Sequence, residues 1–275
     1  MIEKIAVIGC GWLGLPLAKS LVINSFFVNG STTSIDKVSR IASNGIAPFL
    51  INLGLEKSGD DIQLFLDADL LIINIPPGRG TEQADDYEDK ISALAKEIEK
   101  STIKKVIFIS STSVYPDIND HVDETYEDKS ESASAKRMLA AEEIIKSIPK
   151  IQSTIIRMAG LIGPNRHPGR FFSGKENIPS GLSPVNLIHL EDCIGVIEFV
   201  IENNLWDQTF NAAAPSHPLK TDFYDLASQK FNGKSAQFLQ EEGSYKIVDS
   251  AKIISEGYQF KHPDLMKWLL QNPQN

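Results

Sequence analysis

A glycine-rich segment near the start of the sequence has the composition of a phosphate-binding loop. Gly9, Gly11 and Gly14 form the sequence GCGWLG, directly after the apolar run IAVI and before an amphipathic stretch. The first two glycines let the backbone turn and approach a pyrophosphate at a helix N-terminus, and the third allows close packing of helix on strand. A tight turn with glycines for packing alone is the alternative. We favour a dinucleotide-binding loop, because three glycines at this spacing cost more backbone entropy than one turn requires, and we assign Trp12 and Leu13 to it.

The end of the second apolar run indicates which dinucleotide binds. An NAD site usually has an acidic residue about 20 residues beyond the glycines, to hold the ribose 2′-hydroxyl. No Asp or Glu occurs between residues 15 and 35, and the sequence there is GSTTS. Hydroxyl groups with a nearby cation suit a 2′-phosphate, so we expect NADP, with NAD possible, to contact Ser31, Thr32, Thr33 and Lys37. The same residues could instead cap the next helix.

Basic residues gather in a later segment that is rich in Gly and Pro, IGPNRHPGRFFSGK. Arginine binds phosphate and carboxylate groups in a bidentate manner, so this loop is a candidate substrate site in an otherwise acidic protein. Surface charges without a ligand are the alternative. The substrate-binding candidates are Arg166, Arg170 and Lys175, together with Asn186 in the segment VNLIHLED. Asp192, in the same segment, is expected to cap the following helix.

The elements that must position these residues alternate along the first half of the chain. Apolar, β-branched runs such as IAVI and LLIINIPP are separated by longer amphipathic stretches. This alternation predicts an α/β fold, in which a parallel sheet carries helices on both faces. The strands read as continuous apolar runs because both faces of such a sheet are covered. Pro76, which follows one of these strands, is assigned to the cofactor site.

The composition excludes several classes of function. A formal charge of −9 and a pI near 5.1 argue against nucleic-acid binding. Two cysteines cannot build a disulfide framework, and the five histidines are spread too widely in sequence to suggest a metal motif. No leader pattern and no apolar run of about 20 residues occurs, so we expect a cytoplasmic protein without a membrane span.

Four segments in order, GCGWLG, VIFISSTSVYP, IIRMAGLIGP and VNLIHLED, resemble the short-chain dehydrogenase/reductase superfamily in its extended, epimerase/dehydratase-like branch, within an atypical subgroup. The resemblance implies a Rossmann-type doubly wound parallel sheet with a small C-terminal α/β substrate domain. The Rossmann domain would comprise residues 1–160 and 185–213, and the substrate domain residues 161–184 and 214–275. One departure is Ile8, where extended members typically carry the first glycine of GxxGxxG.

The resemblance also implies a role for Ser111, in the segment ISSTSVY. It occupies the position whose hydroxyl binds the reacting oxygen of the substrate. Thr112 and Ser113 stand where 4,6-dehydratases carry an acid pair, and hydroxyls cannot replace carboxylates in proton transfer near neutral pH. These residues therefore argue against a 4,6-dehydratase. A strand-end hydroxyl that caps the backbone is the alternative for Ser111.

Members of this superfamily use a tyrosine to transfer the proton and a lysine four residues later to bind the nicotinamide ribose, since residues i and i+4 share a helix face. None of the six tyrosines has such a lysine. Lys136 keeps the lysine position, with Ser132 in place of the tyrosine, although Arg137 and Met138 could also be aligned there. Tyr126 is the nearest substitute proton donor. A solvated side chain is the alternative for Lys136.

We therefore expect an NAD(P)-binding, epimerase/dehydratase-like oxidoreductase. It would transfer hydride at a hydroxyl or carbonyl carbon of a small, possibly nucleotide-linked, substrate. The alternative is a catalytically inactive regulatory protein that senses NADP(H). We expect no nucleic-acid partner, and the oligomeric state stays open.

Overall fold

The structure, a computed structural model, describes residues 2–53, 58–77 and 86–271 of the 275. The strands are β1 Lys4–Ile8, β2 Phe27–Thr32, β3 Ala47–Asn52, β4 Ser58–Gly59, β5 Leu70–Ile73, β6 Lys105–Ser111, β7 His121–Val122, β8 Gln152–Met158, β9 Gly160–Ile162, β10 Leu187–His189, β11 Thr209–Ala212 and β12 Ile247–Val248. The α-helices are α1 Gly14–Ile23, α2 Val38–Ala42, α3 Ile62–Phe65, α5 Tyr87–Glu99, α6 Ala133–Lys146, α7 Leu190–Glu202, α8 Lys220–Asn232, α9 Ala251–Ser255 and α10 Leu265–Gln271. Short 3₁₀ helices are η1 Ile35–Lys37, η2 Thr112–Val114 and η3 Pro168–Phe171.

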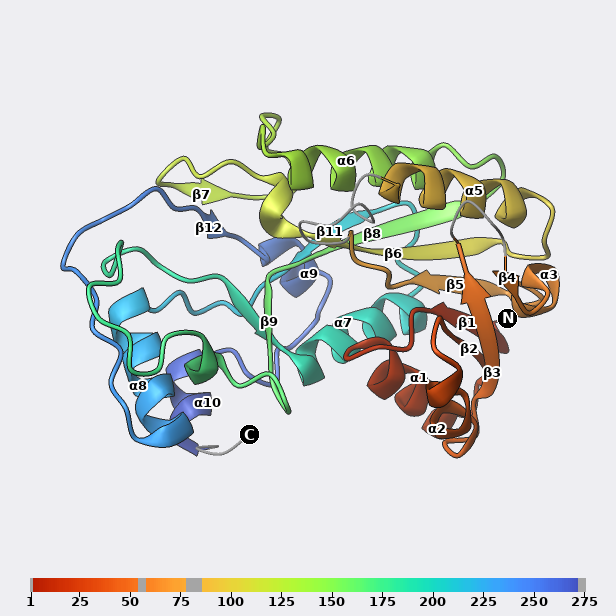
Figure 1. The fold of residues 1–275 in the computed structure, drawn as a ribbon. Helices are drawn as coiled ribbons and strands as arrows, with labels where there is room; N and C mark the ends of the chain where they lie inside the picture. The colour runs from red at the N-terminus through yellow and green to blue at the C-terminus, as the bar shows by residue number, and fades with distance from the viewer. Residues whose placement is uncertain (1, 54–57, 78–85, 272–275) are drawn as a thin grey trace. The chain divides into compact units, whose positions relative to one another are not determined.

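The main sheet has the strand order β11-β8-β6-β5-β1-β2-β3-β4 (Figure 1). The central strand β1 pairs in parallel with β2 on one side and with β5 on the other, so that Ile5 lies opposite both Val28 and Leu70. The edge strand β4 pairs antiparallel with β3. From β1 the chain first adds β2, β3 and β4 on one side, and it then returns to add β5, β6, β8 and β11 on the other side. This order confirms the Rossmann-type doubly wound fold.

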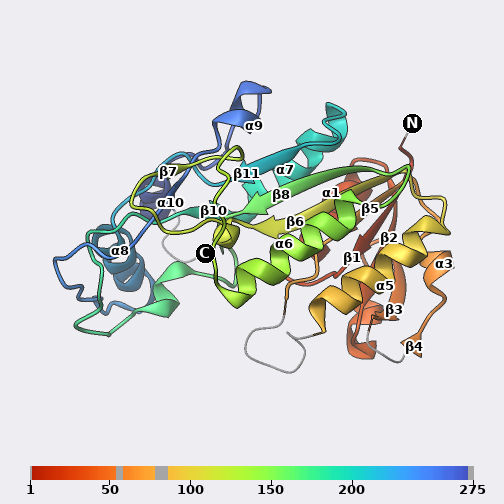
Figure 2. The same ribbon diagram turned by 90° about the horizontal axis from the view of Figure 1, so that it is seen from above.

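Helices cover both faces of this sheet, as the apolar runs of the strands require. Helices α5 and α6 lie side by side on one face, and α1 lies on the other (Figures 1 and 2). In α5 the buried side chains Ile91, Leu94 and Ile98 recur at helical spacing and face the sheet. The strand β5 between these layers is fully covered, since every one of its residues is buried.

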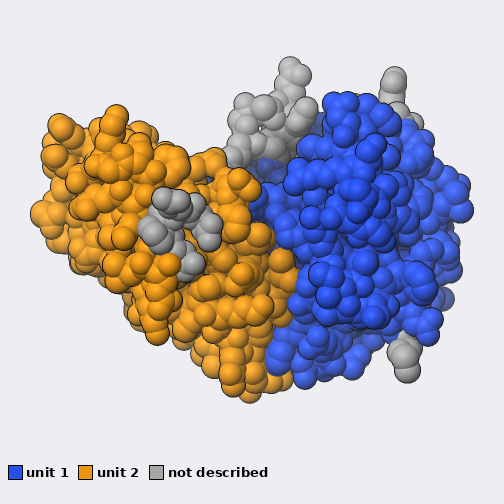
Figure 3. Space-filling model, turned by 90° about the horizontal axis from the view of Figure 1, so that it is seen from below, with its two compact units in different colours: residues 1–110, 132–156, 197–209 blue, residues 111–131, 157–196, 210–275 orange. Residues whose placement is uncertain are grey.

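The chain divides into two compact units, coloured in Figure 3. Unit 1 comprises residues 1–110, 132–156 and 197–209, and unit 2 comprises residues 111–131, 157–196 and 210–275. Residues 111–131, 157–160, 185–196 and 210–213, which the division expected from the sequence places in the Rossmann domain, belong to unit 2. The segment after β6 therefore leaves the unit that contains most of the sheet.

Unit 2 has its own apolar core and its own small parallel pairings. Strand β9 pairs with β10, and β7 pairs with β12. The core gathers side chains from β9, β10, α8 and α10, among them Phe223, Trp268 and Leu269. Within the described residues, the helices are all too short or too polar to cross a membrane.

Candidate functional site

The three glycines of the GCGWLG loop have different structural demands. Gly9 has a φ of +97°, and a Cβ atom there would lie 2.5 Å from the carbonyl oxygen of Asn74. A Cβ atom on Gly14 would lie 2.2 Å from the carbonyl oxygen of Gly9. At Gly11, by contrast, no heavy atom of the described chain lies within 4 Å of the added carbon. Packing thus explains why positions 9 and 14 must be glycine. It does not require glycine at position 11, where the space beside the backbone is open.

The loop is fixed by the strands on either side of β1. The N–H of Gly9 donates to Ser31 Oγ at 3.1 Å, and the N–H of Cys10 donates to the carbonyl oxygen of Ser31 at 2.8 Å. From the other side, Asn74 Nδ2 donates to the carbonyl oxygen of Gly9 at 3.1 Å. The loop therefore lies at the carboxyl ends of β1, β2 and β5, where the strand order reverses and doubly wound proteins bind ligands.

The N-terminus of α1 follows the loop and can receive an anion. Leu13 makes no side-chain cap, and the first turn of this ten-residue helix contains no acidic residue. Its N–H groups and the helix dipole thus favour a negatively charged ligand. Leu13 is buried and can contribute only its backbone, whereas Trp12 is half-buried and Pro76, beyond β5, is exposed.

The hydroxyl groups at the end of β2 are largely used within the chain. Ser31 is only 2% exposed and binds Gly9, and Thr32 Oγ1 accepts from the N–H of Ser34 at 3.1 Å. Thr33 and Lys37 are exposed. Asp36 is exposed beside them, in the first turn of η1. Asp36 follows directly after the stretch 15–35 that has no acidic residue, and it lies about 20 residues beyond Gly14, where an acidic side chain can hold the ribose 2′-hydroxyl.

Helix α6 turns its sheet-facing side toward the end of β6. Ser110 Oγ donates at 2.5 Å to Glu142 Oε1, and Glu142 is completely buried. Met138, one turn before Glu142, is buried on the same face, whereas Lys136 is exposed. The lysine of the motif could align with Lys136, Arg137 or Met138. Of these three residues, Met138 is the buried one, on the side of α6 that faces the sheet.

Ser132, which stands in place of the tyrosine, is the N-cap of α6. Its side-chain oxygen accepts from the N–H of Ala135 at 3.2 Å. This is the ordinary use of serine at a helix start. Ser132 thus has a structural role, and the local sequence explains its presence without any catalytic function.

We expect Ser110→Ala to lower the free energy of unfolding by about 1–3 kcal/mol, because it removes a hydrogen-bond donor from a buried carboxylate. Urea denaturation of the purified protein measures this change. Ser39→Ala, at an exposed position in α2, is the matched control and should stay within about 0.5 kcal/mol of the wild type. Equal stabilities for the two variants would show that the hydrogen bond from Ser110 to Glu142 contributes no measurable free energy of unfolding.

In unit 2, Ser111 keeps a hydroxyl proton that it can donate. Its Oγ accepts from the N–H of Ser113 at 3.1 Å and thereby caps η2, and the side chain is half-buried. Tyr115, by contrast, is buried, donates to Asn211 Oδ1 at 2.9 Å and accepts from Arg157 at 2.8 Å. Burial raises the pKa of Tyr115. Tyr115 is therefore a structural residue, as its place at a strand end suggests.

Tyr126 lines a surface hollow of about 370 Å³ in unit 2. The side chain is half-buried, and Lys129 Nζ donates to its backbone carbonyl. The hollow is lined by His121, Val122, Asp123, Thr125, Tyr126, Glu127 and Asp249. Tyr126 therefore faces a space that a small molecule could enter.

The residues of the basic loop differ in their availability. Arg170 and Lys175 are exposed, although Arg170 also donates to the carbonyl oxygen of Asn165 at 3.1 Å, and Arg166 is half-buried. The side chain of Asn186 is already occupied: Nδ2 donates to the carbonyl oxygen of Lys246 at 2.8 Å, and Oδ1 accepts from the N–H of Val248 at 2.8 Å. It holds the segment around β12 in place, and no sequence signal could have indicated this.

Asp192 is completely buried and binds the C-terminal segment of unit 2. It accepts from Tyr258 Oη at 3.0 Å and from the N–H groups of Lys261 at 2.6 Å and His262 at 3.0 Å. It lies in the first turn of α7, but these partners are distant in sequence. Its role is thus to hold two parts of the chain together, beyond the local cap that we expected.

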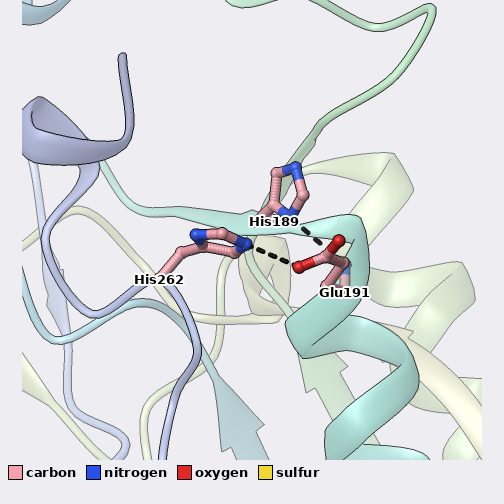
Figure 4. Close-up of side chains that lie close together, drawn as sticks. All are labelled: His189, Glu191 and His262. Carbon is pink, nitrogen blue, oxygen red and sulfur yellow. Dashed lines mark hydrogen bonds and ion pairs between the residues drawn. The ribbon is translucent and has the colours of Figure 1, made fainter. Parts of the chain in front are cut away.

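Close to Asp192, the fold brings together residues that the sequence separates widely. His189, Glu191 and His262 converge, with the Glu191 carboxylate 2.8 Å from His262 Nε2 (Figure 4). His189 is 4% exposed, and burial lowers its pKa to about 4. From sequence spacing alone, the histidines are too scattered to suggest a metal motif. That spacing gives no sign of the contact that the fold makes between His189, Glu191 and His262.

The fold is shared with solved structures of NAD-bound proteins. A short-chain dehydrogenase/reductase superfamily protein from Agrobacterium tumefaciens with bound NAD superposes with a TM-score of 0.79 at 13% identity, covering 98% of this chain and 96% of that one. UDP-glucuronic acid 4-epimerase from Bacillus cereus, in complex with NAD, gives a TM-score of 0.75 at 21% identity and covers 92% of each chain. The chain thus has the same fold as a short-chain dehydrogenase/reductase superfamily protein and a UDP-glucuronic acid 4-epimerase.

The sequence identifies the family more closely. The chain is 36% identical over 267 residues to Protein YeeZ of Escherichia coli K12. The aligned region covers 95% of this chain and 97% of that protein. The chain belongs to the same family as Protein YeeZ. No protein-family profile matches it.

Proposed function

We propose that this chain is an NAD(P)-binding oxidoreductase of the epimerase/dehydratase type. The observation that carries the proposal is the open space at Gly11, in a loop beside an uncapped helix N-terminus. A glycine that packing does not require, at a loop position with open space beside it, fits a backbone that must approach a pyrophosphate. The NAD-bound proteins with the same fold agree with this proposal.

The proposed site uses backbone groups for the cofactor and side chains for the substrate. The N-terminus of α1 would bind the pyrophosphate, which the open space at Gly11 lets come close to the backbone, and the nicotinamide, when bound, supplies or accepts hydride. Ser111 would donate a hydrogen bond to the reacting oxygen, and Tyr126 would transfer the proton. Lys136 is proposed to contact the nicotinamide ribose, a role that its exposed position permits only if the long side chain folds back over α6. Arg170 and Lys175 would bind the anionic part of the substrate.

The substrate is proposed to be small or nucleotide-linked, with a hydroxyl or carbonyl group as the reacting centre. The Bacillus cereus 4-epimerase of the same fold binds UDP-glucuronic acid and NAD. In this chain the exposed cations of the basic loop support an anionic substrate. Catalysis is tested by following nicotinamide fluorescence with pools of sugar nucleotides and simple carbonyl compounds.

We expect Ser111→Ala to lower turnover on the order of 100-fold, because a donor to the developing oxyanion is lost. Binding of the dinucleotide should not change. Ser113→Ala, at the exposed neighbouring serine, should retain turnover. Full activity in Ser111→Ala would remove this residue from the proposed mechanism.

For the cofactor, we propose NADP, on the basis of the exposed Thr33 and Lys37. A charged hydrogen bond contributes about 1.5–3 kcal/mol, so Lys37→Ala should weaken NADPH binding about 10-fold and leave NADH binding unchanged. Asp36→Ala should strengthen NADPH binding, because a negative charge near the 2′-phosphate is removed. Tighter binding of NADH than of NADPH by the wild type would instead assign Asp36 to the ribose hydroxyls.

A second candidate function is a sensor of NADP(H) without catalysis. Two observations favour it. Ser132, in place of the proton-transferring tyrosine, caps α6, and Lys136, in place of the ribose-binding lysine, is exposed. Tight NADPH binding without turnover on any of the substrate pools would support this function.

A further inference from the structure

The cluster of His189, Glu191 and His262 in unit 2 has the composition of a metal site. The ligand atoms that these residues offer all lie within 4.8 Å of one another. The two imidazole rings have centroids 4.2 Å apart and cross at 72°, and Figure 4 shows both rings turned toward Glu191. Two histidines and one carboxylate are a ligand set that binds Zn²⁺ and leaves a fourth position open.

The surrounding structure holds the three residues in place. His189 ends β10 and packs against Trp268, with ring centroids 5.0 Å apart. The buried carboxylate of Asp192 accepts from the N–H of His262 at 3.0 Å and from the preceding N–H at 2.6 Å. Glu191 precedes Asp192 in the first turn of α7. The backbone at each of the three positions is thus fixed, which lowers the entropic cost of collecting the ligands.

A metal site also needs a path by which the ion can reach its ligand atoms from solvent. The side chain of Glu191 is 56% exposed and that of His262 is 21% exposed, so an ion can reach them.

Two existing contacts would change when an ion binds. His189 Nδ1 accepts from the N–H of Glu191 at 3.3 Å, which is long for a hydrogen bond and therefore weak. In the 2.8 Å contact between His262 Nε2 and Glu191, the neutral imidazole would take the tautomer with its proton on Nδ1, so that Nε2 and the carboxylate oxygen both become ligands. These two interactions would be replaced by bonds to the ion.

We propose that His189, Glu191 and His262 bind one divalent transition-metal ion of the Zn²⁺ type, with water in the remaining position. Imidazole nitrogens favour Zn²⁺, Co²⁺ or Ni²⁺ over Mg²⁺ and Ca²⁺, which prefer oxygen ligands. Such an ion would join the start of α7 to the segment before α10. The proposal does not depend on dinucleotide binding, because all three ligands lie in unit 2.

The test is a titration of chelator-treated full-length protein with Zn²⁺, followed by calorimetry, and with Co²⁺, followed by its visible absorption. We expect one ion per chain and the absorption bands of a tetrahedral or five-coordinate Co²⁺ site. His262→Ala and Glu191→Gln should each weaken binding about 100-fold, since the loss of outer partners alone costs 10- to 100-fold. His121→Ala, at an exposed histidine outside the cluster, should bind as the wild type does.

Glu191→Gln keeps the shape and hydrogen-bonding capacity of the exposed side chain, so it separates metal binding from folding. Thermal unfolding without metal should show this variant to be as stable as the wild type. Added Zn²⁺ should then raise the melting temperature of the wild type and leave that of Glu191→Gln unchanged. The proposal is overturned if the wild type shows no saturable binding of one ion, or if both cluster variants bind Zn²⁺ as tightly as the wild type does.

Discussion

Gly11→Asp is expected to weaken binding of the dinucleotide by 100-fold or more while leaving the protein folded. A side chain at Gly11 meets no heavy atom of the described chain within 4 Å of its Cβ, so the substitution costs little in packing. The new carboxylate would lie where the pyrophosphate is proposed to bind. Two like charges about 4 Å apart repel by about 4 kcal/mol at the effective dielectric of a protein surface, which corresponds to roughly a 1000-fold loss before screening by salt.

Gly11→Asn is the matched control, because it has nearly the same size as aspartate and no charge. It separates steric from electrostatic effects, and we expect a smaller loss than with aspartate. Circular dichroism and the melting temperature should show both variants to be as stable as the wild type. Gly9→Ala, in contrast, should destabilise the protein, since its Cβ would lie 2.5 Å from a backbone oxygen. Unchanged affinity in Gly11→Asp would place the dinucleotide elsewhere.

Asp192→Ala is expected to lower the free energy of unfolding by about 3–5 kcal/mol, through the loss of a buried hydrogen-bond network. The substitution leaves three donors without this partner, namely Tyr258 Oη and the N–H groups of Lys261 and His262. The segment that they belong to would lose its attachment to the start of α7. Chemical denaturation followed by far-ultraviolet circular dichroism measures the change.

Two further variants define the origin of that effect. Asp192→Asn keeps one oxygen as an acceptor, so its stability should lie between those of the wild type and Asp192→Ala. Asp128→Ala, at an exposed loop position, should change stability by no more than about 0.5 kcal/mol. If Asp192→Ala unfolds within 1 kcal/mol of the wild type, the three hydrogen bonds contribute little and the segment is held by its apolar contacts.

The fold could be predicted because its signals are local and periodic. The strands β1 and β5 are continuous apolar runs, and the glycine loop follows the first of them directly. Both features depend on neighbours in sequence and on the burial of a doubly covered sheet. The same local logic explains Ser132, whose position just before a helical stretch is typical of an N-cap.

The contacts that complete the candidate sites are not local, and for that reason the sequence could not reveal them. Asn186 binds backbone groups some 60 residues away, and Asp192 binds donors nearly 70 residues away. His189 and His262 meet where both rings pack against Trp268 and where Asp192 binds the backbone of His262. The side of α6 that faces the sheet is identified by one tertiary contact, the hydrogen bond from Ser110 in β6 to Glu142 in α6.

The most direct test of a dinucleotide-binding loop is calorimetric titration of the wild-type protein with NADPH and with NADH. We expect saturable binding of one dinucleotide per chain, with NADPH the tighter of the two. The absence of binding heat for both dinucleotides, together with an unchanged melting temperature in their presence, would contradict the assignment of the GCGWLG loop.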